Sequence, residues 1–112
     1  MNVTTERQDD VLSILVSGRV DGFNAPQFEE AVRAAVEDGD RAVIMDLEKL
    51  TYISSTGLRV LLMFIRDLLR RETAVAFCTV SEQVRKVITI SGFDQFIPIH
   101  PSRAEALAAL DA

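Results

Sequence analysis

The chain has 112 residues, of which 48% are hydrophobic and 26% are charged, which is typical of one soluble globular domain. Its formal charge of −5 argues against electrostatic binding to nucleic acid or to an anionic membrane surface. We therefore expect a single domain over residues 1–112, no direct nucleic-acid partner and no membrane insertion. The one cysteine, Cys78, excludes an intramolecular disulfide and a thiolate zinc cluster.

The first residues lack the basic start and the apolar stretch of a secretion signal. The uncharged run over residues 60–65 is far too short to span a bilayer. The expected location is therefore the cytoplasm. The charge is unevenly spread, because residues 1–50 carry five basic and eleven acidic side chains, whereas residues 51–112 carry seven and six.

Hydrophobic periodicity predicts an opening hairpin of two strands, followed by helices and strands in alternation. The predicted strands cover residues 3–7, 11–17, 42–47, 73–80 and 96–99. The predicted helices run from a cap at Asn24 to Gly39, over 55–71, from Ser81 to Gly92, and over 102–110. This β-β-α-β-α-β-α-β-α order is typical of an α/β domain with a mixed, mostly parallel sheet of about five strands.

Three hydroxyl residues in a row separate a predicted buried strand from the second helix. Either Ser54 or Ser55 can cap the N-terminus of this helix, and Thr56 follows in its first turn. Gly57 fits a simple capping segment less well, because glycine inside a helix costs up to about 1 kcal/mol relative to alanine. A bare backbone at that position indicates that another group approaches closely.

The second predicted helix has an apolar stripe and a mixed outer face. The stripe expected to face the core consists of Leu58, Leu61, Leu62, Ile65, Leu68 and Leu69, with Phe64 at its border. The opposite side carries Arg59, Arg66 and Arg70, and it also carries Val60 and Met63 beside Asp67. Apolar side chains among charges on an outer face indicate a surface that binds a partner.

The sequence contains neither a Gly-x-Ser-x-Gly elbow nor either of the standard phosphate-binding glycine loops. No His, Cys and carboxylate cluster has the spacing of metal ligands. We therefore predict no catalytic residue, no cofactor and no metal, and we expect a binding module rather than an enzyme.

Residues 43–47, Leu50 and residues 52–62 together resemble the STAS domain family, which includes bacterial anti-sigma factor antagonists and domains of anion transporters. The resemblance extends to residues 17–26, with their Gly-Arg-Val-Asp run, and to residues 90–97, with their Ser-Gly-Phe run. It covers nearly the whole chain and implies the STAS fold, with helices packed mainly on one face of the sheet.

The resemblance also implies a regulatory role. In antagonists of this family a partner kinase phosphorylates the hydroxyl residue directly before the glycine, which is Thr56 here, with Ser55 as the second choice. The family usually has Asp where this chain has Ser54. The implied partners are an anti-sigma factor of the GHKL serine kinase type, which the unphosphorylated protein binds to release a sigma factor, and a PPM-type phosphatase for the phosphorylated form. The expected partner-binding residues are Asp21, Asn24, Ser54, Ser55, Gly57, Arg59, Val60 and Met63.

Two other functions stay open for the same fold. The first is a small STAS subunit of an ABC-type lipid transport system, in which an ATPase subunit would bind the same helix. The second is a nucleotide-sensing STAS module, although the chain has no phosphate loop. For Asn24 we prefer helix capping to partner binding, and for Asp21 the two interpretations are even.

Overall fold

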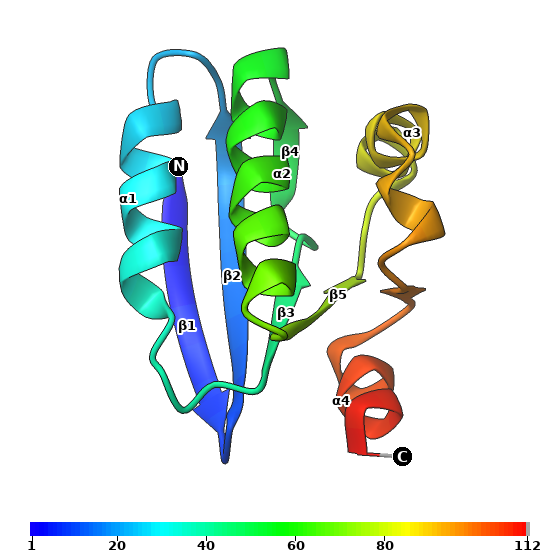
Figure 1. Ribbon diagram of the computed structural model, residues 1–112. Helices are drawn as coiled ribbons and strands as arrows, with labels where there is room; N and C mark the ends of the chain where they lie inside the picture. Colours follow the sequence, from blue (N-terminus) through cyan, green and yellow to red (C-terminus); the bar gives the residue numbers. More distant parts are fainter. Residues whose placement is uncertain (112) are drawn as a thin grey trace.

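A sheet of six strands forms the centre of the structure, and Figure 1 shows it with the helices around it. The computed structural model describes residues 1–111. The strand order is β1-β2-β3-β5-β6, with β4 beside β2. The strands are β1 (Asn2–Gln8), β2 (Val11–Val20), β3 (Ala42–Asp46), β4 (Leu50–Ile53), β5 (Ala74–Cys78) and β6 (Ile99–His100). The β1–β2 pair is antiparallel and the other pairs are parallel, which confirms the mixed, mostly parallel sheet.

The helices divide unequally between the two faces of the sheet. They are α1 (Ala25–Ala35), α2 (Ser55–Arg70), α3 (Glu82–Ser91) and α4 (Arg103–Asp111), with a short 3-10 turn, η1 (Phe93–Gln95). Side chains of α1, α2 and α3 share one large core cluster with Leu12 and Ile14 of β2. Ala106 of α4 packs instead with Val11 and Ile44 from the other face. The expectation that helices pack mainly on one face is therefore confirmed.

The structure adds a strand that the sequence does not predict. In β4 the outer residues Leu50 and Ile53 are buried and the two between them are exposed, a pattern too short to read as alternation. A bulge between Gly18 and Arg19 lets β2 pair with β3 along its first half and with β4 along its second. Gly18 has a φ of 85°, a backbone conformation that is unfavourable for residues with a side chain.

Two predicted element ends are also wrong. The last strand covers Ile99–His100 rather than 96–99, because Phe96 caps the preceding η1 turn in a helical backbone conformation and is exposed. The first helix ends at Ala35, with Val36 in an extended conformation, and does not reach Gly39. The third helix does end at Gly92, which takes the left-handed conformation that favours glycine.

The buried side of α2 is rotated from the predicted stripe. Its buried residues are Gly57, Leu61, Phe64, Ile65 and Leu68. Phe64 lies in the core rather than at the border, and Leu69 is 43% exposed. The reason is that α2 packs against α1 as well as against the sheet (Figure 1), so that its apolar contacts come from two directions.

An ion pair fastens β1 to the segment that follows α1. Arg7 donates hydrogen bonds from Nε and Nη2 to the two carboxylate oxygens of Asp40, at 2.8 and 2.9 Å. The Asp40 side chain is only 2% exposed and also accepts a bond from the backbone amide of Glu37. The hydrogen bonds from Arg7 hold the pKa of Asp40 below its usual value.

Candidate functional site

The candidate site lies where two parallel strands end side by side. The loop that leads to α1 leaves the carboxyl end of β2, and α2 begins directly after β4 (Figure 1). The backbone carbonyl of Val20 accepts a hydrogen bond of 2.8 Å from the amide of Ser54. The carboxyl ends of parallel strands are where α/β proteins commonly bind their ligands.

Ser54 is the N-terminal cap of α2. Its Oγ accepts a hydrogen bond of 3.1 Å from the amide of Gly57. This confirms that one of the two serines caps the helix and assigns the cap to Ser54 rather than Ser55. Ser55 and Thr56 are therefore left with exposed side chains in the first turn. Two exposed hydroxyl residues thus lie at the helix N-terminus, where the helix dipole and the amides of the first turn favour an anion.

Gly57 is buried under this turn and contacts the sheet. A Cβ built at Gly57 would lie 2.7 Å from Val20 Cγ1 and 3.1 Å from Ile53 Cγ1. The close approach expected from the sequence is thus made by neighbouring strands of the same chain. Gly57 was predicted to bind a partner, but it is buried. Its role is to let the hydroxyl-bearing turn pack closely against the sheet.

The loop between β2 and α1 is held by its own side chains. Asp21 Oδ1 accepts hydrogen bonds from the amides of Phe23 and Asn24, at 2.9 and 3.1 Å. Asn24 Oδ1 accepts from the Asp21 amide, and its Nδ2 donates to the Arg19 carbonyl. Asn24 stands at the N-cap position of α1, but its side chain makes no capping bond, so the preferred capping interpretation is wrong.

The loop also lies next to the hydroxyl-bearing turn of α2. A Cβ added to Gly22 would come within 3.8 Å of Thr56 Oγ1. Within this loop Phe23 is 94% exposed. We did not single out Phe23 from the sequence. The available signal was a large apolar residue between Gly22 and Asn24, in a segment with the composition of a turn.

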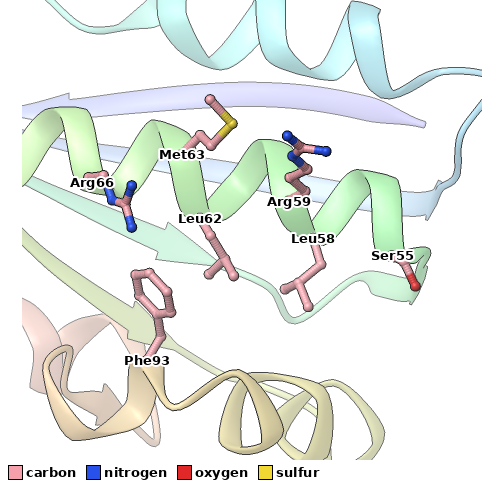
Figure 2. Close-up of a pocket in the computed structure, with 7 residues that line it drawn as sticks. All are labelled: Ser55, Leu58, Arg59, Leu62, Met63, Arg66 and Phe93. Carbon is pink, nitrogen blue, oxygen red and sulfur yellow. The ribbon is translucent and has the colours of Figure 1, made fainter.

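The next turns of α2 carry the remaining predicted residues. Arg59 is exposed and Met63 is 48% exposed, so both lie on the outer side as expected. Val60 differs, because it is half-buried and packs against the core cluster. Leu58 and Leu62 were expected in the core, but they are only half-buried and extend toward the segment that carries Phe93 (Figure 2).

An open groove of about 320 Å³ runs along this part of α2. Six of its lining residues come from α2, and Figure 2 shows Leu58 and Leu62 extending toward the seventh, Phe93 of η1. We call it the α2 groove; its lining residues are Ser55, Leu58, Arg59, Leu62, Met63, Arg66 and Phe93. The sequence pattern indicated a partner surface on α2 but gave no sign of the opposing wall.

Comparisons with known proteins give this arrangement a family. A family model described as the STAS domain matches residues 2–106. The chain belongs to the STAS domain family. It is 38% identical over 109 residues to BtrV of Bordetella bronchiseptica, which is named as a candidate anti-sigma factor antagonist; the match covers 97% of this chain and 94% of BtrV.

Solved structures of STAS proteins agree with the fold. The crystal structure of an anti-sigma factor antagonist from Mycobacterium paratuberculosis has a TM-score of 0.88 at 30% identity and covers 99% of this chain and 94% of that one. The phosphorylated form of SpoIIAA, a Bacillus cell fate determinant, has the same fold, with a TM-score of 0.76 at 21% identity over 97% and 99% of the two chains. The comparisons place the chain with the anti-sigma factor antagonists of the STAS family.

The described residues contain neither a metal-binding cluster nor a membrane-spanning helix. In residues 1–111 no three His, Cys, Asp or Glu side chains come together as a metal site would require. No helix within the same residues has the length and apolarity needed to cross a membrane. Cys78 is buried, and this burial raises the pKa of its thiol, which agrees with an unreactive core residue.

Proposed function

We propose that this STAS protein is an anti-sigma factor antagonist that is switched off by phosphorylation of Thr56. The unphosphorylated form binds an anti-sigma factor of the GHKL serine kinase type and so frees a sigma factor. The kinase supplies the ATP chemistry, and this chain contributes an acceptor hydroxyl and a docking surface without being an enzyme. We further propose that the whole chain acts as one STAS domain in the cytoplasm and that a PPM-type phosphatase restores the active form.

The observation that carries the proposal is that Thr56, a hydroxyl residue, is exposed in the first turn of α2, beside the loop that presents Phe23. A protein kinase needs an accessible hydroxyl, and Thr56 provides one on a rigid element. Ser55 is also exposed and is the second candidate acceptor. The relatives also support the proposal, since several are named anti-sigma factor antagonists and the structure of SpoIIAA has been solved in a phosphorylated form.

The position of Thr56 predicts how a phosphate would act. A phosphate adds a charge of about −1.5 to −2 near neutral pH. At a helix N-terminus that charge is favourable, so the fold should be unchanged. The effect would fall on the docked partner, because a phosphate between two surfaces must lose water or push them apart. A hundredfold loss of affinity requires only about 2.7 kcal/mol.

The surface around Thr56 has the features of a binding site. Phe23 is an exposed aromatic residue on a loop with several internal hydrogen bonds, so the loop backbone loses little conformational freedom when a partner covers it. Aromatic residues of this kind are enriched among those that dominate binding energy. We therefore assign Phe23 to the partner-binding surface, together with Asp21, Ser55 and Thr56.

The test uses purified full-length protein and the GHKL-type kinases encoded in the same genome. Each kinase is incubated with labelled ATP and with the wild-type, Thr56→Ala or Ser55→Ala protein, and binding is measured by calorimetry. We expect labelling of the wild-type and Ser55→Ala proteins, no labelling of Thr56→Ala, and unchanged binding by Thr56→Ala. Thr56→Glu and Phe23→Ala should each bind at least tenfold more weakly.

Different outcomes contradict different parts of the proposal. Labelling of Thr56→Ala but not of Ser55→Ala would move the acceptor to Ser55. If no GHKL-type kinase binds the wild-type protein, the anti-sigma function is wrong. Selective capture of a transporter ATPase by the same protein would then favour the ABC-type subunit.

A further inference from the structure

The α2 groove has apolar walls and a basic rim. Leu58 and Leu62 extend from α2 toward Phe93, and all three are half-buried (Figure 2). Met63 adds further apolar surface on the outer side. Arg59 and Arg66 are exposed and stand seven residues apart along the same stretch. The groove therefore offers apolar contact along its length and a positive charge near each end.

Arg59 and Arg66 have no acidic partner among residues 1–111. The ion pairs found within residues 1–111 do not include Arg59 or Arg66. Asp67, the one acidic residue of α2, pairs instead with Arg33 of α1 at 2.9 Å. In a chain with a net charge of −5, this strip is locally basic. Unpaired basic side chains beside an apolar groove match a ligand that is itself acidic and apolar.

The length of the groove indicates what kind of ligand fits. Ser55 and Arg66 are eleven residues apart on a helix, which corresponds to roughly 16 Å. That is about three helical turns, and the lining residues on α2 recur at three- and four-residue spacing along it. An amphipathic helix laid beside α2 would place its apolar side chains against Leu58, Leu62 and Phe93.

We propose that the α2 groove receives an acidic amphipathic helix of the partner, whose carboxylates pair with Arg59 and Arg66. This inference rests on the proposed function, because the partner meant is the anti-sigma factor. Arg59 connects the groove to the switch, since it lies three residues after Thr56 and four after Ser55 and so neighbours both on the helix surface. A phosphate on either hydroxyl competes for Arg59 and repels the acidic helix, which couples phosphorylation to release.

The test measures the groove without the anti-sigma factor. The probe is a labelled 14-residue peptide with leucines at helical i, i+3, i+4 and i+7 positions and glutamates beside them. A matched peptide carries lysine in place of each glutamate. Binding to the full-length protein is followed by fluorescence anisotropy, and the site is located by amide chemical shifts. We expect the acidic peptide to bind at least tenfold more tightly than the basic one, with shifts centred on Leu58, Leu62 and Phe93.

Charge-swap variants make the test decisive. Arg59→Glu and Arg66→Glu should each weaken the acidic peptide at least fivefold, and Arg66→Glu should bind the basic peptide more tightly than the wild type does. Arg70→Glu is the matched control, because Arg70 is exposed on the same helix outside the groove, and it should change binding less than twofold. A gain of binding by a variant cannot come from misfolding.

Failure of the groove can be told from failure of the proposed function. Equal binding of the two peptides, no binding of the acidic peptide at millimolar concentration, or shifts on another face would overturn the groove inference. The groove inference would also be overturned if an anti-sigma kinase bound the Arg59→Glu and Arg66→Glu variants as tightly as the wild type but bound Thr56→Glu more weakly. That result would still agree with the proposed function. If the protein sediments with phosphatidylglycerol vesicles in a manner that depends on Arg59 and Arg66, and does not bind the peptide, the groove inference is overturned and a lipid surface is favoured.

Discussion

Replacing Gly57 by alanine is expected to destabilise this protein, although alanine is the better helix former. The added methyl group would lie 2.7 Å from Val20 Cγ1, 3.1 Å from Ile53 Cγ1 and 3.3 Å from the Val20 carbonyl oxygen. Val20 is fully buried, and its branched side chain has few alternative rotamers. Its carbonyl holds the amide of Ser54 at 2.8 Å, so the strand cannot move away without loosening the start of α2.

Two opposing terms set the size of the effect. The helix propensity of alanine favours the variant by up to about 1 kcal/mol. Overpacking a well-filled site typically costs about 1–3 kcal/mol. The second term is the larger, and we expect a net loss of about 1 kcal/mol in the free energy of unfolding. For a domain of this size that corresponds to a fall in Tm of roughly 4–8 °C.

The assay is urea unfolding followed by far-ultraviolet circular dichroism. Ser55→Ala is the matched control, because Ser55 is exposed in the same turn and its replacement should change stability by less than about 0.5 kcal/mol. The double variant Val20→Ala/Gly57→Ala removes the closest contact, so the substitution at Gly57 should be neutral or stabilising in that background. A Gly57→Ala protein as stable as the wild type would refute the reasoning, because the methyl group would then have room.

Three further predictions concern polar contacts near the site and at the opposite end of the sheet. Ser54→Ala should lose about 1 kcal/mol of stability in urea unfolding, whereas Ser54→Asp should keep most of it because aspartate also caps helices. Asn24→Ala removes bonds to Asp21 and Arg19, each contributing about 0.5–1.5 kcal/mol, and should speed hydrogen exchange at the Asp21 amide; unchanged exchange would show that the loop needs no such bonds. Asp40→Asn should lower Tm at pH 7. Because Arg7 lowers the pKa of Asp40, wild-type stability is gained above the ordinary Asp pKa of about 3.9 and lost as pH falls through the lowered value. The difference between the two proteins in thermal melts should therefore shrink below about pH 4 and persist at neutral pH.

Most of the fold could be predicted from the sequence because its elements have clear local signals. The cap at Ser81 and the glycine at position 92 delimit α3, and both act as predicted. Strand β3 is apolar from residue 42 to residue 45 because it is buried on both faces. In contrast, β4 depends on the bulge at Gly18, which changes the strand that β2 pairs with. The four residues of β4 contain no pattern from which this change of partner could be predicted.

The candidate site was predicted in part, and the errors have a common physical origin. The hydroxyl run and the exposed Arg59 and Met63 follow from local sequence and helical spacing. The opposing wall of the α2 groove depends on Phe93, thirty residues downstream of Met63, which only tertiary packing brings near. The role of the Asn24 side chain was missed for the same reason: its partners include the Arg19 carbonyl, whose direction is set by the end of β2.

The position of β1 has a consequence for how copies of this protein behave together. β1 stands at one end of the strand order, so one of its edges has no strand beside it in residues 1–111. A free edge can recruit a strand from another molecule, and charged side chains are a common protection against this. In β1 those charges are Glu6, which pairs with Arg103, and Arg7, which pairs with Asp40. We therefore expect the same charged residues that fasten β1 also to disfavour pairing of this strand with another copy.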